Sequence, residues 1–564
     1  MWTTIPDVGK YGLITDAPAH LLPPGAWNSA DNVSFRDGRV FKSKGIRRRY
    51  ASDSLGDGDF YWGFNAVRDG VSHWIYSSLT ALGSIAGTEV QDITRIDSTD
   101  TIVPYTVSRD LLWNGGMFNG EFLILNNGAD TPQSWSPGLN TRCEDLVNWP
   151  SDYICEVLKP FGYFLVAFNT KESGSDRTEN RIHWSHPAGA GALPSSWDTT
   201  DAAVEAGYVD LADTTSGGIL WAEEMRGWMY IYKANSCFAM RYIGGNNIFA
   251  FDPVFGTVGC FSSNCVAPFS HRKGEFHCVF TGDNIIIHDG RDVVETLENR
   301  VMNEFSNRLS QEYPERSYVV NVQKESENWI CFPEGGHDYP NKALVWNYND
   351  GTLNFRDLHG ANWITQGLIV EDSAVSSWDQ ATNSWDSSSR SWNLEGNIAK
   401  FIRPVEFHPQ ASTFDVGTSN ITLSSGMYES EIDEIYKDGD TEEPTYNRIS
   451  RTDLAVLPNR QTKEPMFDLS ARKIMKRARL QLSGGNLKVR LGASEKVGGS
   501  VSWSGVTEVP NGAGVSEVLV DKVMSGRSFA IEIRSDGEVP PNAAINTSWE
   551  LHGYQLDIEK VSDY

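Results

Sequence analysis

A hairpin pattern that recurs about every fifty residues limits the fold of this chain more than any other feature. Between about residues 60 and 360, two short aromatic strands flank a turn of Gly, Asn or Asp, as in "WNGGMFNGEFLILNNG". Alternation such as Trp228, Tyr230 and Tyr232 has the two-residue period of strands. The six instances start at Tyr61, Trp113, Leu158, Trp221, Phe269 and Tyr318.

The spacing of these hairpins predicts a β-propeller. Successive starts are 52, 45, 63, 48 and 49 residues apart, and a blade of this length buries its faces only against neighbouring blades. The region accommodates about six blades at roughly fifty residues each. The alternative is a set of unrelated hairpins in a large β-sandwich.

The regions on either side of the repeats differ from them. Residues 1–50 contain Pro23-Pro24-Gly25 and a hairpin signal at Asp37-Gly38, a dipeptide that favours two-residue turns. Residues 401–564 hold further alternating strands such as "RSFAIEIRS", which is typical of two-faced antiparallel sheets. We therefore expect a mainly β chain with an N-terminal segment (1–50), a propeller (51–370), a Trp-repeat loop (371–400) and a C-terminal β-rich domain (401–564).

Three tryptophans recur every seven residues in a polar stretch, "SSWDQATNSWDSSSRSWN" (376–393). A coiled coil needs two apolar positions per heptad, and this stretch has one. Ser, Asp, Asn and Thr also disfavour helix interiors. We expect an ordered loop of three turn units in which Trp378, Trp385 and Trp392 anchor each turn on an apolar surface; the alternative is a flexible linker.

Charge and composition exclude some functions. The net charge of −26 argues against a general nucleic-acid clamp, which needs a basic face. We find no signal peptide and no apolar run long enough to span a membrane. The seven cysteines lack CxxC spacing, so we expect them to be reduced and mostly buried, in a protein made in a cytoplasm.

Two basic clusters interrupt this acidic chain. The first is either a solvated edge or a contact for an acidic partner or phosphate, and the second either pairs between subunits with the acidic segment 428–446 or is solvated. The clusters are Arg47, Arg48 and Arg49, and then Arg472, Lys473, Lys476 and Arg477.

No catalytic constellation is evident. The chain lacks GxSxG, HExxH and P-loop motifs. His183 and His186 in "HWSHP" have no third metal ligand nearby and suit a turn between blades. Asp53, Asp57 and Asp59 do not have the spacing of an EF-hand. We therefore predict no enzymatic activity, no cofactor and no metal site.

The N-terminal segment "GLITDAPAHLLPPGAWNSADNVSFRDGRVFKSKG" resembles the start of the tail nozzle, or packaged-DNA stabilisation, proteins of short-tailed bacteriophages. Residues 23–25, 30–33 and 36–38 carry the likeness. "FNGEFLILNNGADTPQSW" (118–135), "NRIHWSHP" (180–187), the Trp repeat and "WELHGYQLDIE" also look like that family.

This resemblance implies a structural protein of the virion. It implies a homo-hexameric ring bound to a tail adaptor ring and to tail fibres or spikes. The ring would retain packaged double-stranded DNA and conduct it through an acidic channel without specific binding. It also implies that residues 1–50 join the C-terminal domain in a platform. The Trp loop is then either an interface, between propeller and platform or between subunits, or a gate at the tube exit.

Two other functions remain open. A propeller hydrolase acting on glycans predicts clustered carboxylates at one mouth of the propeller. A receptor-binding module, in which exposed aromatic side chains on the blade loops hold sugar, predicts that the isolated protein binds cell envelopes.

Overall fold

The structure is a computed structural model of the chain. It describes all residues except 52–59, 88, 173, 212–216, 246, 298–299, 359, 371–399, 410–411, 416–419, 424, 433–446, 459–464, 485–486, 510–511, 536–548 and 563–564.

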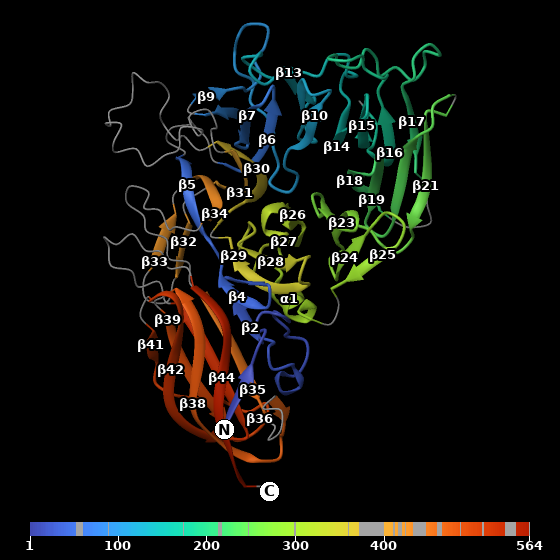
Figure 1. Cartoon of the computed structure of the whole chain (residues 1–564). Coiled ribbons are helices and arrows are strands. Elements are labelled where there is room, and N and C mark those ends of the chain that lie inside the picture. The colour runs from blue at the N-terminus through green and yellow to red at the C-terminus, as the bar shows by residue number, and fades with distance from the viewer. Residues whose placement is uncertain are drawn as a thin grey trace, which may run out of the picture. The chain divides into compact units, whose positions relative to one another are not determined.

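Six four-stranded antiparallel meanders follow one another in the described part of the chain (Figure 1). Five are separate sheets, and the sixth is continuous with a larger sheet. The first three are β6 (Trp62–Arg68), β7 (Val71–Ser77), β8 (Leu82–Ala86) and β9 (Glu89–Asp92); β10 (Asn114–Phe118), β11 (Phe122–Asn126), β12 (Gln133–Trp135) and β13 (Glu144–Asp145); and β14 (Ile154–Phe161), β15 (Phe164–Lys171), β16 (Thr178–Trp184) and β17 (Gly207–Asp210). The next three are β18 (Ile219–Met225), β19 (Trp228–Lys233), β20 (Cys237–Tyr242) and β21 (Phe249–Phe255); β22 (Val266–His271), β23 (Gly274–Phe280), β24 (Ile285–His288) and β25 (Val293–Thr296); and β26 (Tyr318–Val322), β27 (Glu327–Phe332), β28 (Lys342–Asn347) and β29 (Thr352–Asp357).

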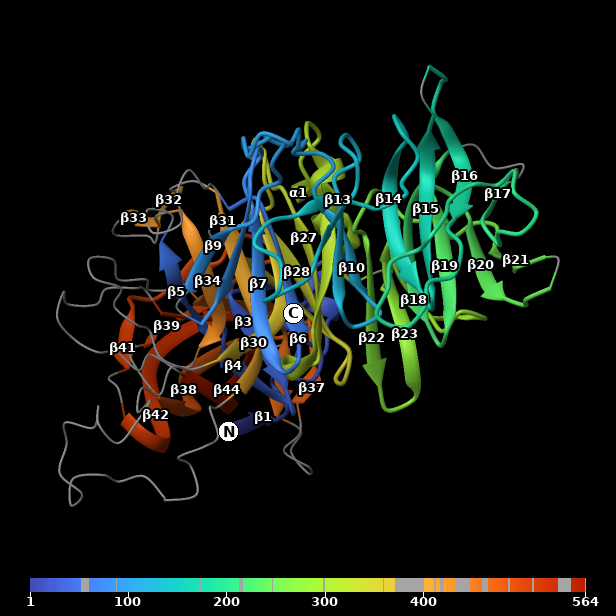
Figure 2. The same ribbon diagram turned by 90° about the horizontal axis from the view of Figure 1, so that it is seen from above.

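The predicted hairpins form the first strands of these six blades. Local turn chemistry explains why: Asp69-Gly70 and Asn119-Gly120 both have positive φ at their two central residues, as the tight turns between twisted strands require. Figure 2 shows the strands of the third blade, β14 to β17, lying side by side in sequence order. The expected mainly β fold with a β-propeller of about six blades is confirmed.

Two compact units divide the chain. The blade unit comprises residues 51–214 and 363–409, and the platform unit comprises residues 1–50, 215–362 and 410–564. The blade unit holds the first three blades and the antiparallel hairpin of β30 (Trp363–Val370) and β31 (Lys400–His408). The domain boundaries expected from the sequence stay predictions.

Large aromatic side chains fill the core of the blade unit. Trp62, Trp113 and Trp135 are buried in one cluster that spans the first two blades. Phe118 and Trp197 belong to a second cluster, which spans the second and third blades. Burial of aromatic side chains supplies most of the packing between blades that are too thin to be stable alone.

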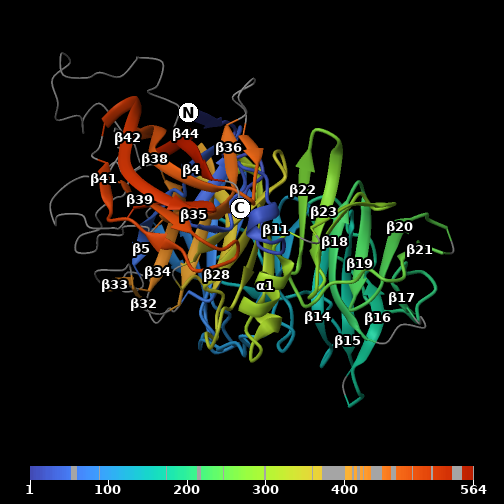
Figure 3. The ribbon, with the colours of Figure 1, turned by 90° about the horizontal axis from the view of Figure 1, so that it is seen from below.

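The platform unit joins both ends of the chain in one sheet. Strands β3 (Val33–Arg36) and β4 (Arg39–Lys42) flank the predicted Asp37-Gly38 turn. The strand order is β3-β4-β44-β38-β42, and β1 (Trp2–Ile5) also pairs with β44. Strands β38 (Arg472–Gly484), β42 (Gly512–Gly526) and β44 (Trp549–Ser562) are long and adjacent (Figure 3). The expected platform of N-terminal and C-terminal segments is confirmed.

A second platform sheet extends the sixth blade. Strand β2 (Ser29–Asp31) pairs in parallel with β29 and antiparallel with β35 (Asn447–Leu454). The sheet continues through β43 (Ser528–Ser535), β39 (Leu487–Ser494), β40 (Ser502–Trp503) and β41 (Thr507–Val509). The other elements of the described residues are β5 (Gly45–Ala51), β32 (Ser412–Asp415), β33 (Asn420–Leu423), β34 (Gly426–Ile432), β36 (Val456–Pro458), β37 (Pro465–Phe467), α1 (Met302–Arg308) and the 3-10 turns Ala19–Leu21, Pro314–Arg316 and Gln323–Glu325.

Two composition-based expectations can be compared with the fold. All seven cysteines are buried and none forms a disulfide, as expected. Among the described residues, no helix is both long enough and apolar enough to cross a membrane.

Candidate functional sites

The residues predicted to form interfaces have different outcomes. Trp378, Trp385 and Trp392 lie outside the described residues, so the interface or gate role of their loop stays a prediction. Arg47, Arg48 and Arg49 lie on β5, and their contact with a partner also stays a prediction. Asp53, Asp57 and Asp59 lie outside the described residues as well.

The second basic cluster lies on β38, and its side chains bind partners within the platform unit. Lys473 is buried and donates to two backbone carbonyls, and burial lowers its pKa to about 8. The other three cations pair with acidic side chains: Arg472 with Glu495 at 2.7 Å, Lys476 with Glu559 at 2.6 Å and Arg477 with Asp557 at 3.3 Å. The structure explains the cluster by these local pairs, and a partner contact stays a prediction.

His183 is a buried structural side chain at the end of β16. The ring accepts from the Tyr153 hydroxyl at 3.0 Å through Nδ1 and donates from Nε2 to the Trp197 carbonyl at 3.1 Å. Burial lowers the pKa of His183 to about 4. His186 Nδ1 accepts the backbone N–H of Glu205 at 3.0 Å. Both histidines therefore satisfy hydrogen bonds of the third blade.

A cleft of about 690 Å³ opens in the blade unit between two loops. One wall follows β9 and the other lies between β12 and β13, so the first and second blades each contribute one side. The lining residues are Arg95, Ile96, Asp97, Val103, Leu139, Asn140, Thr141, Arg142, Cys143, Glu144 and Asp145. Its volume is within the roughly 300–1,000 Å³ of small-molecule sites.

Two arginines are held in fixed positions in this cleft. Arg95 pairs with Asp130 at 2.9 Å and lies over the Tyr105 ring, 4.8 Å from its centroid. Arg142 pairs with Asp92 at 2.6 Å and also donates to the Thr94 carbonyl. Such charge-assisted bonds restrict a guanidinium to one orientation, so the basic groups of the cleft are pre-organised.

Three carboxylates line the cleft among these arginines, and the Asp145 carboxylate lies 3.6 Å from the Arg95 guanidinium. Asp145 accepts from the Gln133 amide at 2.6 Å, and its side chain is 63% exposed. The Thr99 hydroxyl and the backbone N–H groups of Thr101 and Thr99 bind the Asp97 carboxylate and lower its pKa. With two arginines and three carboxylates, the lining is almost balanced in charge, and it presents both donors and acceptors to a ligand.

Sequence reasoning missed this cleft. Arg95 and Arg142 are 47 residues apart in the sequence, and neither belongs to a basic cluster. The one available signal is that each follows a Thr next to a strand, "ITRI" and "NTRC", which is too common a pattern to identify a site.

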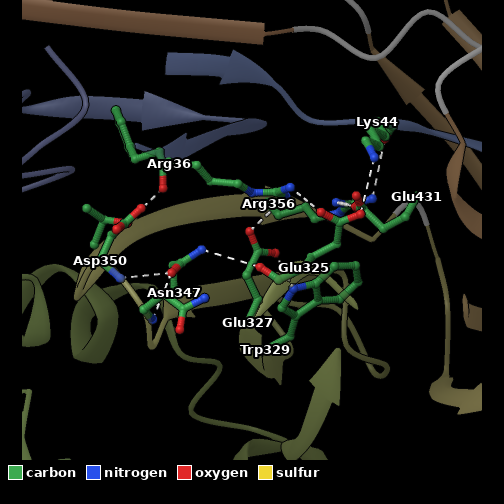
Figure 4. A network of polar contacts seen from close by, with 12 residues as sticks. Arg36, Lys44, Glu325, Glu327, Trp329, Asn347, Asp350, Arg356 and Glu431 are labelled. Carbon is green, nitrogen blue, oxygen red and sulfur yellow. Dashed lines mark hydrogen bonds and ion pairs between the residues drawn. The ribbon is translucent and has the colours of Figure 1, made fainter. Parts of the chain in front are cut away.

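A second candidate is a buried ion network in the platform unit (Figure 4). Arg36, from β3, pairs with both Glu325 and Glu327, and Lys44 pairs with Glu325 at 3.2 Å. Arg356 of β29 pairs with Glu431 of β34. The three carboxylates are between 2% and 4% exposed. The network thus holds together an N-terminal segment, the sixth blade and a strand from the C-terminal region.

Aromatic packing and opposed pKa shifts accompany these pairs. Trp329 donates to Glu327 at 3.0 Å, and the Arg356 guanidinium lies 4.3 Å from the centroid of the Trp329 ring. Burial raises the pKa of Glu327, against the opposing charge of Arg36. Burial also acts on Glu325, but Arg36 and Lys44 together outweigh it and lower the pKa of that carboxyl.

Opposed carboxyl pKa values can indicate an acid–base pair. Here Glu325 and Glu327 are almost fully buried, and their oxygens already accept bonds from cations and from Trp329. A substrate would have to displace these partners. We therefore assign the network to stability rather than to chemistry.

A chain of buried hydrogen bonds crosses the fourth and fifth blades. Gly290 N–H donates to His288 Nδ1 at 3.1 Å, so neutral His288 carries its proton on Nε2 and donates to the Tyr232 hydroxyl at 2.7 Å. Tyr232 in turn donates to His277 Nδ1 at 2.7 Å, and His277 Nε2–H donates to the Glu224 carbonyl. The direction of every bond is fixed by its partners.

Replacing Tyr232 by Phe tests this chain. The change leaves one donor and one acceptor, on His288 and His277, buried without a partner, so we expect a loss of about 1–3 kcal/mol in the free energy of unfolding. Urea denaturation measures it, with Tyr242→Phe as the control, because Tyr242 is 58% exposed. A Tyr232→Phe protein as stable as wild type would show that the hydroxyl is dispensable.

No protein-family model matches the chain, and no curated protein matches it. Solved structures do. The extracellular domain of a candidate one component system from B. thetaiotaomicron has a TM-score of 0.34 and 11% identity, over 73% of this chain and 41% of that chain. An exo-β-1,3-galactanase from Phanerochaete chrysosporium, solved with β-1,3-galactotriose, has a TM-score of 0.28 and 8% identity; the match covers 82% of this chain and 98% of that chain. Bacteroides ovatus xyloglucan PUL GH43B has a TM-score of 0.24 and 10% identity, over 91% and 100%.

At these TM-scores and identities the matches transfer no residue, substrate or activity to this chain. This chain spans about two-fifths of the first protein, 41% of its length, and nearly all of the two others.

Two predictions are corrected by this comparison. The chain was expected to be a tail nozzle and not an enzyme, but the matched structures named above include two glycan-related proteins, an exo-β-1,3-galactanase and xyloglucan PUL GH43B, and no tail nozzle protein. We therefore do not retain the nozzle, and the alternative, a propeller that acts on glycans, is taken up below as a proposal. The resemblance to the nozzle family, the hexamer, its partners and its place in a virion were not tested and stay predictions from sequence.

Proposed function

We propose that this protein is a β-propeller protein that acts on glycans and binds an uncharged oligosaccharide in the cleft of the blade unit. The observation that carries the proposal is the lining of the cleft. Fixed guanidinium donors and exposed carboxylate acceptors face one space of about 690 Å³.

The chemistry of this lining suits hydroxyl groups. A sugar hydroxyl both donates and accepts, so it pairs with a carboxylate and a guanidinium at once. Leu139 and Ile96 are 69% and 38% exposed at the cleft, and they offer apolar contact for the C–H groups of a sugar ring. Glu144 and Asp145 oppose binding of phosphates or nucleic acid, as does the chain's charge of −26.

Binding is tested with purified protein and neutral oligosaccharides, including β-1,3-galactotriose and xyloglucan fragments, by glycan array and calorimetry. We expect Asp145→Ala and Arg142→Ala to weaken binding about tenfold or more, because each removes a charged hydrogen-bonding group. Reducing-sugar release in the same samples measures hydrolysis, which requires two carboxyl groups flanking the bond.

Glu89→Ala is the matched control. Glu89 is an exposed acidic residue at the start of β9 that does not line the cleft, so its loss changes charge without changing the site. The proposal fails if no neutral glycan binds the wild-type protein, or if both cleft variants bind as tightly as the Glu89→Ala protein.

A further inference from the structure

A second surface of the blade unit has the features of a sugar contact. Tyr208, on the outermost strand of the third blade, is 52% exposed. The Arg181 guanidinium on the neighbouring strand lies 4.4 Å from the centroid of its ring. Arg181 pairs in register with Asp210, which lies two residues after Tyr208 and so on the same face of the strand.

Ion pairs fix this arrangement in place. Arg181 donates to both oxygens of Asp210, at 2.8 and 3.0 Å, and to Glu172 at 2.7 Å. The bond from Arg181 lowers the pKa of Asp210 and keeps that carboxylate ionised as an acceptor. A cation held on an aromatic ring also restrains the ring, so the exposed Tyr208 is pre-organised to receive a ligand.

The same combination of side chains recurs in the fourth blade. Trp228 is 38% exposed at the start of β19, and the Arg241 guanidinium lies 6.0 Å from its ring centroid. Arg241 pairs with Asp252 at 3.0 Å across the next strand. Exposed positions of a blade are not constrained by core packing, so folding alone does not account for an aromatic–arginine–aspartate set in both blades.

The size and charge of the Tyr208 surface indicate its ligand. A stable protein partner covers about 800 Å² on each side, whereas one tyrosine ring presents roughly the area of one sugar ring. Asp210 and Glu172 stand beside the ring with side chains 43% and 53% exposed. They can accept sugar hydroxyls and would repel an anionic ligand.

We propose that an uncharged sugar ring binds at a second site, formed by Tyr208, Arg181 and Asp210. With this site, the protein can hold one polysaccharide chain both there and in the cleft. This inference rests on the proposed function. Once a polymer is bound at one site, its other sugar rings are at a high effective concentration near the second site, so the affinity for the polymer increases. A short ligand occupies only one site, so its affinity does not change.

The test is affinity electrophoresis of Tyr208→Ala in gels containing neutral polysaccharides, among them β-1,3-galactan and xyloglucan. For a polysaccharide that slows the migration of the wild-type protein, we expect the affinity of the Tyr208→Ala protein to be about fivefold lower, as the loss of one aromatic contact predicts. Calorimetry should give an unchanged affinity for the oligosaccharide held by the cleft. Tyr208→Phe keeps the ring and should bind like wild type.

Tyr163→Ala is the matched control, because Tyr163 is 62% exposed in a turn of the same blade and its loss removes a similar apolar area. Thermal unfolding of all variants confirms that each is folded. If the Tyr208→Ala protein binds polysaccharide like wild type while the Asp145→Ala protein binds more weakly, the second sugar site is refuted and the proposed site in the cleft is supported. If wild-type protein is not retarded by any polysaccharide and binds no oligosaccharide, both proposals fail.

Discussion

Replacing Arg356 by Ala should lower the free energy of unfolding of the platform unit by about 3–5 kcal/mol, since it removes one partner of a buried ion pair. The Glu431 carboxylate that remains is 2% exposed and cannot regain water without opening the structure. Arg356 also donates to the Ser430 hydroxyl at 3.1 Å and lies over Trp329. Urea denaturation, with hydrogen exchange to locate the loss, measures the effect.

Two comparisons separate this effect from the loss of a charge in general. Arg472→Ala breaks an ion pair whose side chains are 41% and 58% exposed, so we expect less than about 1 kcal/mol. The double change Arg356→Met and Glu431→Leu removes both charges and should recover much of the stability. A single Arg356→Ala change as mild as Arg472→Ala would refute the structural role of the network.

Both compact units should lose stability as the pH falls from 7 to 5. Burial lowers the pKa of His183 to about 4 in the blade unit, and burial, reinforced by His277, lowers the pKa of His288 to about 3 in the platform unit. An unfolded histidine titrates near about 6.5. Below that pH the histidine is protonated in the unfolded state but stays neutral in the folded state. The free energy of unfolding therefore decreases as the pH falls.

The expected loss is about 2 kcal/mol per unit between pH 7 and pH 5. This window lies above the titration of ordinary carboxyl groups, so the histidines dominate it, and carboxyls whose pKa burial raises, such as Glu327 and Glu156, act in the opposite direction. Urea denaturation at both pH values gives the total, and hydrogen exchange assigns it to each unit. His183→Gln should reduce the dependence in the blade unit alone, and the remainder belongs partly to His73, whose pKa burial also lowers; an unchanged slope in that variant would mean that another group is responsible.

The strands and their turns were predictable because their signals are local. Asp69-Gly70 and Asn119-Gly120 specify tight turns within a few residues of the strands they join. The alternation of Trp228, Tyr230 and Tyr232 likewise identifies β19 without any knowledge of its neighbours. These signals repeat at a nearly constant interval, and the interval predicts the blade.

The sites were not predictable because their residues meet only through the fold. "VQKESENW" looks like an exposed polar turn, yet Glu325 and Glu327 are buried. They are stable there because Arg36, from nearly three hundred residues earlier, provides the opposite charge. The cleft depends in the same way on loops from two blades. A single sequence contains no local trace of such pairings.

The platform sheet also determines the order in which the molecule can be completed. Strand β44, near the end of the chain, lies between β4 and β38 and pairs with β1 as well. During translation the N-terminal strands are synthesised first. They cannot pair with β44 until about five hundred more residues have been added, because Val40 pairs in register with Leu551. Contacts this distant in sequence form slowly. The blades are built from strands that are neighbours in the sequence, so they can form during translation. The platform sheet forms last, after β44 has been synthesised.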